Sequence, residues 1–537
     1  MRPRLLLSGL FPLLALSACI LSEAQKVDDA AGAGGTGGST SSQTGPGGGG
    51  AGAGGAGGTG GMGGMPPTCT SPDPGATEWV ASFGEVDEPL AGAADQRITG
   101  LALDPDGIVI LGRYTEAMTG AGKAYPSFDG GGHGFLAWLT PEGDYVVEGG
   151  QKALVYQGVG LGPPLTRGLA VNGDHVAVVG ALDGGLTVGT AMVPAPANRD
   201  AFFVEHEAAS ITADAYAEIA AGEDQLDDVA LGVGGQVFVS GFTTAGVQLP
   251  GGDVSPPVGG SVFFASVGAQ PWIYPLATGY EKADAIQVVT SADGTLYVAT
   301  SIKAGSYDVG EPIDVTSNSG VLVARVDPVG TISDAVLFEG GGSDGDQAFV
   351  RELAIGPDGR LVVMGSFFGD LVFDASLAHV LTTSSGQTDG FVAVLDPTTL
   401  TATHWASFGT SATNETIWAA ALDPCGEIVL LGTFRGEMMV GGDLLSPQGP
   451  ADLFVTKATL EPDGSLAPVW ARGFGHPNHV ECAAANLQNE RNCYRLVATE
   501  EGVYVAGAYG GDIDLGDGRP DHIPISGEDS FVMKLAP

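Results

Sequence analysis

The sequence predicts an all-β protein, a seven-bladed β-propeller of four-stranded antiparallel blades, and three observations lead to this prediction. First, a unit of about 65 residues recurs seven times, as in repeat architectures. Second, short runs of Val, Ile, Leu, Phe and Tyr alternate with Gly, Pro and Asp, whereas apolar residues at helical spacing are nearly absent. Third, the two ends of the folded part carry complementary pieces of one unit.

The repeated unit contains an apolar strand, an Asp-Pro-x-Gly turn, a second apolar strand that ends in Gly, and later an Asp-x-Phe-Val strand. Clear copies of its first part lie at 101–112, 353–365 and 420–432. In the sixth unit we expect four strands, at 417–422, 427–434, 452–458 and 467–474. Pro presets φ in the turns and Gly takes the left-handed position. Because one such sheet cannot bury both faces alone, we expect the sheets to stack around an axis.

The two ends of the folded part predict that this ring is closed. Trp79-Val80-Ala81-Ser82-Phe83-Gly84 matches the outer strands that contain Trp405 and Trp470. The chain ends on Ser530-Phe531-Val532-Met533-Lys534-Leu535, the strand that precedes such an outer strand. We therefore expect residues 78–83 to complete the seventh blade beside residues 530–535.

Together these motifs resemble the long bacterial β-propeller repeat called SBBP-type. Its pattern combines Trp-x-x-x-Phe-Gly, Ala-x-Asp-Pro-x-Gly-x-Val-x-Val-x-Gly and Asp-x-Phe-Val-x-Lys-Leu, and the resemblance covers nearly all of residues 76–537. The resemblance implies the propeller fold and an exported or surface protein. It implies no activity, because proteins with this repeat are mostly uncharacterised.

The first residues have the pattern of a lipoprotein export signal. Residues 1–18 have a basic start, an apolar run and small residues, and Leu16-Ser17-Ala18-Cys19 resembles a bacterial lipobox. This implies cleavage before Cys19 and diacylation of its sulfur; the alternative is an ordinary signal peptide with an incidental cysteine. By analogy with enteric bacteria, Ile20 in place of Asp predicts the outer membrane, on its periplasmic or its outer side.

Residues 19–68 are expected to be the lipidated cysteine followed by a disordered linker, and residues 69–537 the propeller. Gly fills roughly half of the positions from 30 to 65, so this stretch cannot bury enough apolar surface to fold. As a flexible coil the linker would span on the order of 40 Å. The formal net charge is -42, which argues against a nucleic-acid partner because phosphates would be repelled. Nothing in the sequence requires an oligomer, so we expect a monomer.

Besides Cys19 the chain has four cysteines, and an even number in an exported chain favours two disulfides. Cys482 and Cys493 lie in one expected loop and form the natural pair. Cys69 and Cys425 remain as the second pair, which would fasten the closing strand to its neighbouring blade. No Cys-x-x-Cys spacing indicates a metal or redox motif.

Polar residues recur just before the innermost strands, at Asp95, Asp224, Asp346 and Asn414. One interpretation is a ring of oxygens at the mouth of the central channel that binds Ca²⁺. The other, which we favour, is that these side chains accept hydrogen bonds from loop N–H groups. No other cofactor and no further metal site is expected. Residues 512–518 resemble a calcium loop, but the equivalent segments of other units make a strand the better interpretation; His476 and His479 are assigned to a surface loop.

Two classes of function follow from these observations. The leading hypothesis is a non-enzymatic, surface-anchored lipoprotein that touches the membrane only through its lipid. Its propeller binds an unknown protein or glycan through the face with the long loops, since loops on a rigid scaffold often carry recognition. No catalytic residues are assigned. The alternative is an extracellular polysaccharide hydrolase or lyase that uses two channel carboxylates as acid and base.

Overall fold

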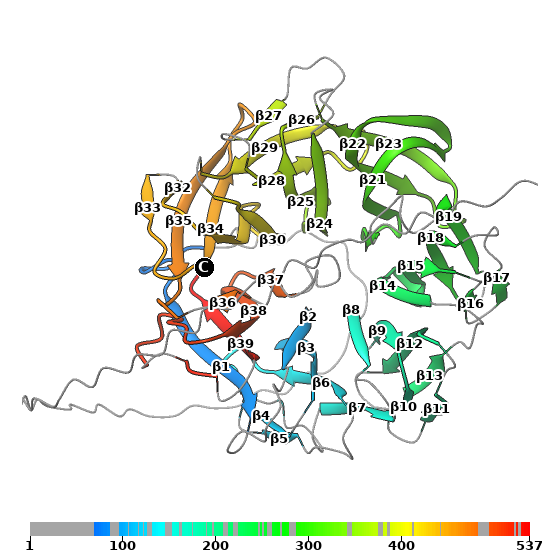
Figure 1. Cartoon of the computed structure of the whole chain (residues 1–537), viewed down its shortest axis with the longest axis horizontal. Coiled ribbons are helices and arrows are strands. Elements are labelled where there is room, and N and C mark those ends of the chain that lie inside the picture. The colour runs from blue at the N-terminus through cyan, green and yellow to red at the C-terminus, as the bar shows by residue number, and fades with distance from the viewer. Residues whose placement is uncertain are drawn as a thin grey trace, which may run out of the picture. The chain divides into compact units, whose positions relative to one another are not determined.

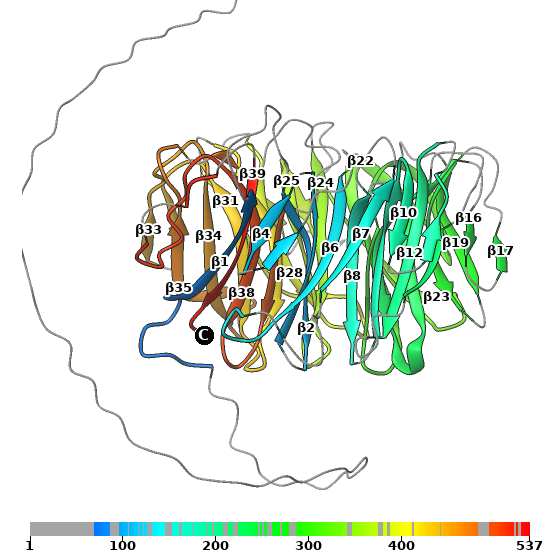
Figure 2. The same cartoon turned by 90° about the horizontal axis from the view of Figure 1, so that it is seen from below.

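The computed structural model describes residues 69–537 apart from short stretches, the longest of which are 86–95, 279–285 and 482–492. Within the described residues the regular structure is β-strand, except for a 3-10 turn at Val233–Gly235. Seven small antiparallel sheets form a seven-bladed propeller, as predicted (Figure 1). The strands run between the two faces of the ring (Figure 2). In the part of the chain described, no helix is long and apolar enough to cross a membrane.

Each blade is built from four core strands, whose order from the axis outward follows the chain except in blade 7. In blades 1 to 4 they are β2 (Arg97–Asp104), β3 (Gly107–Tyr114), β6 (His133–Leu139) and β7 (Ala153–Val159); β8 (Leu165–Asn172), β9 (His175–Leu182), β12 (Asp200–Glu207) and β13 (Ala213–Ala217); β14 (Asp224–Leu231), β15 (Val237–Thr243), β18 (Ser261–Val267) and β19 (Trp272–Thr278); β20 (Gln287–Thr290), β21 (Leu296–Val309), β22 (Glu311–Val326) and β23 (Ile332–Glu339). In blades 5 to 7 they are β24 (Gln347–Ile355), β25 (Leu361–Phe368), β28 (Asp389–Leu395) and β29 (Ala402–Phe408); β30 (Thr416–Leu422), β31 (Ile428–Phe434), β34 (Asp452–Leu460) and β35 (Leu466–Phe474); β37 (Tyr494–Ala498), β38 (Val503–Gly510), β39 (Glu528–Leu535) and β1 (Thr77–Glu85). The four strands expected in the sixth unit are therefore present within two residues of the expected ends.

Short hairpins between the second and third strands add a feature that the sequence analysis did not predict. β4 (Met118–Gly120) of the first unit pairs with β1, the outer strand of blade 7, and β5 (Lys123–Tyr125) pairs with β4. In the same way β10 (Gly185–Val188) and β11 (Ala191–Val193) extend blade 1, and β26 (Asp370–Val372) and β27 (Val380–Thr382) extend blade 4. β16 (Val247–Leu249) with β17 (Gly252–Val254), and β32 (Met438–Val440) with β33 (Asp443–Leu445), form separate hairpins, and β36 (Val480–Glu481) pairs with β38. The added strands cover outer edges that would otherwise present unpaired N–H and C=O groups.

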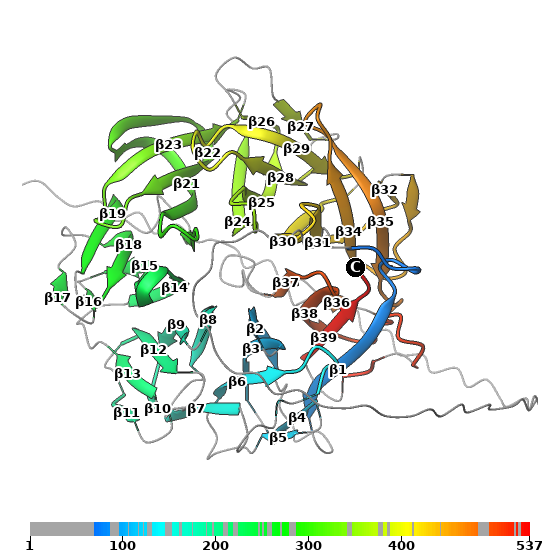
Figure 3. The same ribbon diagram turned by 180° about the vertical axis from the view of Figure 1, so that it is seen from behind.

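The ring closes at blade 7, as predicted. β1 pairs antiparallel with β39, with Trp79 opposite Lys534 and Phe83 opposite Ser530 (Figure 3). The innermost strands also contact one another in order around the axis, and β37 of blade 7 contacts β2 of blade 1. The first and last strands of the folded part therefore share one sheet.

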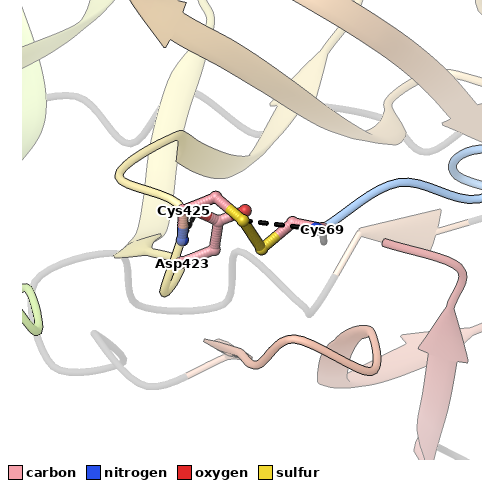
Figure 4. Close-up of side chains that lie close together, drawn as sticks. All are labelled: Cys69, Asp423 and Cys425. Carbon is pink, nitrogen blue, oxygen red and sulfur yellow. Dashed lines mark hydrogen bonds between the residues drawn. A yellow bond between two sulfur atoms is a disulfide. The ribbon is translucent and has the colours of Figure 1, made fainter. Parts of the chain in front are cut away.

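The predicted disulfide between Cys69 and Cys425 is present, with a Cα–Cα distance of 6.1 Å (Figure 4). It joins the residue that begins the described chain to the Asp-Pro-x-Gly turn of blade 6. Cys493 is buried, but Cys482 lies outside the described residues, so the pairing of these two cysteines stays a prediction.

Tryptophans of the outer strands pack between blades. Trp79 donates a hydrogen bond from Nε1 to the carbonyl of Pro141 at 2.9 Å, in a turn of the adjacent blade. The ring of Trp79 lies against Gly143 of that turn, and Trp405 lies in the same way against Gly464 in blade 6. Both glycines have positive φ, which favours a residue without Cβ. The same contact thus locks successive blades at their outer edges.

Candidate functional site at the propeller axis

A single register position, repeated in the innermost strands, gathers polar side chains around the propeller axis. In β2, β8, β14, β24 and β30 the pairing with the second strand shifts by one residue at the same place, just after the residue that faces the glycine of the second strand. Such β-bulges redirect a side chain and are frequent beside functional sites. The residues at this position in blades 1, 2, 3, 5 and 6 are Thr99, Arg167, Asp227, Arg351 and Trp418. In blade 7 the strand pairs without the shift, and Arg495 follows Tyr494, the residue that faces Gly507.

Members of this ring contact residues of the neighbouring blade. The hydroxyl of Thr99 lies 2.9 Å from that of Thr166 in the next innermost strand. Arg167 of blade 2 forms an ion pair with Asp227 of blade 3 at 3.3 Å. Arg351 of blade 5 lies over the ring of Trp418 in blade 6, with Cζ 5.1 Å from the ring centroid. In this layer of side chains, contacts therefore join blade 1 to blade 2, blade 2 to blade 3 and blade 5 to blade 6.

Two carboxyl groups in the strands of blades 3 and 5 extend this layer toward blade 7. Burial raises the pKa of Glu352 to about 8; the positive charge of Arg495 opposes this shift, and the negative charge of Asp228 adds to it. Burial also raises the pKa of Asp228 to about 6, against hydrogen bonds from backbone N–H groups and the charge of Arg495. Arg495 therefore interacts electrostatically with carboxyl groups from two other blades. We call Glu352, Asp228, Arg495 and the five ring residues the axial cluster.

The two carboxyl groups of the axial cluster differ in their hydrogen bonds. Asp228 accepts from the backbone N–H of Val229 and from that of Val288, each at 2.9 Å, so it ties blade 3 to the innermost strand of blade 4. Oε2 of Glu352 is buried and accepts no hydrogen bond from the described residues. Asp228 thus links two blades through hydrogen bonds, whereas Oε2 of Glu352 forms no such link among the described residues.

The axial cluster is positively charged inside a strongly acidic protein. It holds three of the chain's 21 basic residues, although the net charge of the chain is -42. Asp227 and Asp228 oppose the arginines, but Glu352 is mostly neutral at pH 7 because its pKa is about 8. The cluster lies near the ends of the innermost strands where the long loops enter, since its members are among the first residues of those strands. The side chains of the cluster are of the type that binds anions, because Arg donates bidentate hydrogen bonds to carboxylate and phosphate groups.

Of the four residues expected at the loop face, Asp224 and Asn414 accept hydrogen bonds from loop N–H groups. The N–H of Thr244 donates to Asp224 at 3.1 Å, and the N–H of Thr388 donates to Asn414 at 2.9 Å. Asp346 is buried beside Gly369. Asp95 lies outside the described residues. These contacts agree with the loop-holding interpretation, and calcium binding at the four positions stays a prediction.

The other segments considered for metal binding have local partners. Asp514 pairs with Gly475 and Ile513 with His522, so residues 512–518 include the strand-like pairing that the sequence analysis favours. His476 lies 3.7 Å from Asp512, while His479 lies outside the described residues. Among the described residues, the group of three potential ligands is Cys69, Asp423 and Cys425 (Figure 4). Its two sulfurs form the disulfide and are no longer thiolates.

Comparisons with known proteins add little to this picture. No model of a protein family matches the chain, and no curated protein matches it. A crystallised protein of unknown function from Bacteroides caccae is 11% identical with a TM-score of 0.20, and the match covers 51% of this chain and 89% of that one. The quinohemoprotein alcohol dehydrogenase from Comamonas testosteroni is 10% identical with a TM-score of 0.37, over 82% of this chain and 76% of that one. The fold therefore rests on the strand pairing of this chain, and the SBBP-type resemblance stays an expectation.

Proposed function

We propose that this protein is a non-enzymatic binding protein whose propeller recognises a carboxylate-bearing partner, a glycan or a protein, at the axial cluster and the surrounding long-loop face. The observation that carries the proposal is the electrostatic interaction of Arg495 with the carboxyl groups of Glu352 and Asp228 from two other blades, of which Glu352 is mostly neutral at pH 7. The closed ring supplies a rigid frame for them. A carboxylate of the partner would accept a charge-assisted hydrogen bond from an arginine of the cluster. Because water competes less for a partly buried arginine than for an exposed one, more of this attraction is kept.

We further propose that a lipid on Cys19 and the Gly-rich linker hold the propeller at the bacterial outer membrane, as a monomer that touches the membrane only through this anchor. The support is the sequence of residues 1–68 alone. In cells fed labelled palmitate, we expect the wild-type protein to be labelled and the Cys19→Ser variant to carry no label. Equal labelling of both proteins would refute the anchor.

Changing Arg495→Gln should weaken binding of a carboxylate-bearing ligand by about 10-fold or more, because a hydrogen bond to a charged group contributes about 1.5–3 kcal/mol. The measurement is calorimetric titration of the full chain with an oligouronate, a neutral oligosaccharide of equal length and an acidic peptide. Arg519→Gln is the matched control, since Arg519 is exposed and lies outside the axial cluster. Equal weakening by both variants, or equal binding of the neutral sugar, would count against the axial site.

Binding of the same ligand should weaken as the pH rises through about 8, where the buried Glu352 ionises. Its folded-state pKa is raised, so the neutral form prevails below that pH, and above it the new negative charge competes with the ligand for Arg495. Asp228 interacts electrostatically with both Glu352 and Arg495, and ionisation of Asp228 near pH 6 adds a weaker step in the same direction. Glu352→Gln should remove the step near pH 8 and leave tight binding at high pH.

A second candidate function is favoured by one observation. Glu352 and Asp228 are electrostatically coupled carboxyl groups, and a raised pKa such as that of Glu352 suits a general acid in glycoside cleavage. Against this role, both oxygens of Asp228 already accept backbone hydrogen bonds. Turnover of a polysaccharide panel that disappears in Glu352→Gln would establish the hydrolase or lyase and overturn the binding proposal.

A further inference from the structure

Two buried aspartates that are not members of the axial cluster meet where blade 2 joins blade 3. Asp200 begins the third strand of blade 2, and Asp224 begins the innermost strand of blade 3. They are 1% and 2% exposed. The N–H of Asp224 donates to the carbonyl of Arg199 at 2.9 Å, so the two strand ends lie side by side.

The two aspartates differ in the number of hydrogen bonds that they accept. Asp224 accepts from the N–H of Thr244 at 3.1 Å and from the side chain of Thr243. Both carboxylate oxygens of Asp200 are buried, and neither has a hydrogen-bond partner among the described residues. A buried carboxylate without a partner is strongly unfavourable, because desolvation is not compensated.

The equivalent aspartate of blade 6 shows what this position normally does. Asp452 also begins the third strand of its blade and accepts hydrogen bonds from the N–H groups of Gln448 and Gly449, the latter at 3.2 Å. It therefore holds the loop before its own strand. Asp200 makes no such bonds, although it occupies the same place in the repeat.

The local charges leave the pair with an excess of negative charge. Burial and the neighbouring Asp224 both raise the pKa of Asp200, to about 6, and burial also raises the pKa of Asp224. Arg199 precedes Asp200, but its guanidinium forms a bidentate pair with the exposed Asp183 at 2.9 and 3.1 Å. Two buried carboxylates side by side require either a proton or a cation between them.

We propose that Asp200 and Asp224 bind a divalent cation, Ca²⁺, at the junction of blades 2 and 3. Among the described residues, the junction offers side-chain oxygens from two carboxylates and the hydroxyl of Thr243, and oxygen is the ligand atom that Ca²⁺ prefers. The ion would link the third strand of one blade to the innermost strand of the next. The proposal is independent of the ligand at the axial cluster.

The test compares the thermal unfolding of the full chain in EDTA and in CaCl₂ at pH 7, with a calcium titration by calorimetry. For the wild type we expect a rise of several degrees in Tm with calcium, because a ligand that binds only the folded state stabilises it. Asp200→Asn should abolish this rise and one binding event. In EDTA the same variant should be at least as stable as the wild type, since a buried charge is removed.

Asp452→Asn serves as the matched control at the equivalent position of blade 6. It should lower Tm in both solutions, because it weakens the hydrogen bonds to the loop, and it should keep the full rise with calcium. A wild type whose Tm does not respond to calcium would overturn the proposal in favour of a shared proton. A response that persists undiminished in Asp200→Asn would also overturn it, by placing the calcium elsewhere on the acidic surface.

Discussion

Replacing Lys457 with methionine is expected to lower the free energy of unfolding by about 3–5 kcal/mol, because it breaks a buried ion pair from one side. Nζ of Lys457 lies 2.8 Å from Asp423 and 2.8 Å from Glu427, and the side chains of Lys457 and Asp423 are each 2% exposed. The same Nζ donates to the carbonyl of Cys69 at 3.1 Å. Without the ammonium group, the charge of Asp423 stays buried and uncompensated. Urea denaturation followed by tryptophan fluorescence would measure the loss.

Two variants test the cause of that loss. Lys534→Met changes the equivalent lysine of blade 7, which pairs with the more exposed Glu78 at 2.9 Å and should lose less than about 1 kcal/mol. Adding Asp423→Asn to Lys457→Met should recover part of the stability, because the orphaned charge is removed. If Lys534→Met were as harmful as Lys457→Met, the effect would come from lost packing of the lysine stem and not from the buried pair.

The closing strand was predictable because every unit of the repeat should contain four strands, and the pattern shows which strand the last unit lacks. Trp79 to Gly84 has the residues of an outer strand, and the final unit ends one strand short. Once β1 is placed beside β39, the turn of blade 6 that contains Cys425 becomes adjacent to the start of the folded chain. This is why the pairing of Cys69 with Cys425 could be predicted across a sequence separation of 356.

The axial cluster was not predicted, and the reason is structural. Asp228, Glu352 and Arg495 belong to three different blades, and only the closed ring brings them together. Their strands carry one-residue bulges in blades 3 and 5, which shift side chains between faces without any marked change in sequence pattern. Comparing the residue five positions before each Asp-Pro-x-Gly turn could have shown Thr99, Arg351 and Trp418 at one level. The sequence pattern instead marks the residues where the innermost strands begin, such as Asp224, which accepts a hydrogen bond from a loop N–H group.

Removing the disulfide with the double change Cys69→Ser and Cys425→Ser should lower the free energy of unfolding by about 2–5 kcal/mol, because the bond closes a very long loop in the unfolded chain. The bond joins the start of the folded chain to blade 6, while β1 pairs with blade 7. Beyond the overall loss, we therefore expect the seam between β1 and β39 to open more often than the other blades. Hydrogen exchange should show faster exchange of the β1 amides in the variant, with blades 2 to 5 changed only by the overall loss of stability.

The blades that lose protection from hydrogen exchange distinguish two roles of the disulfide, which either holds the ring closed at β1 or only constrains the unfolded chain. If the disulfide acted only on the unfolded state, all blades would lose protection equally and β1 would not stand out. Lys457 and its hydrogen bond to Cys69 hold the same residue, so Lys457→Met combined with the serine variant should release β1 further than either change alone. Uniform loss of protection in the combined variant would mean that β1 is held by its pairing with β39 alone, and that the contacts of Cys69 do not control the closure of the ring.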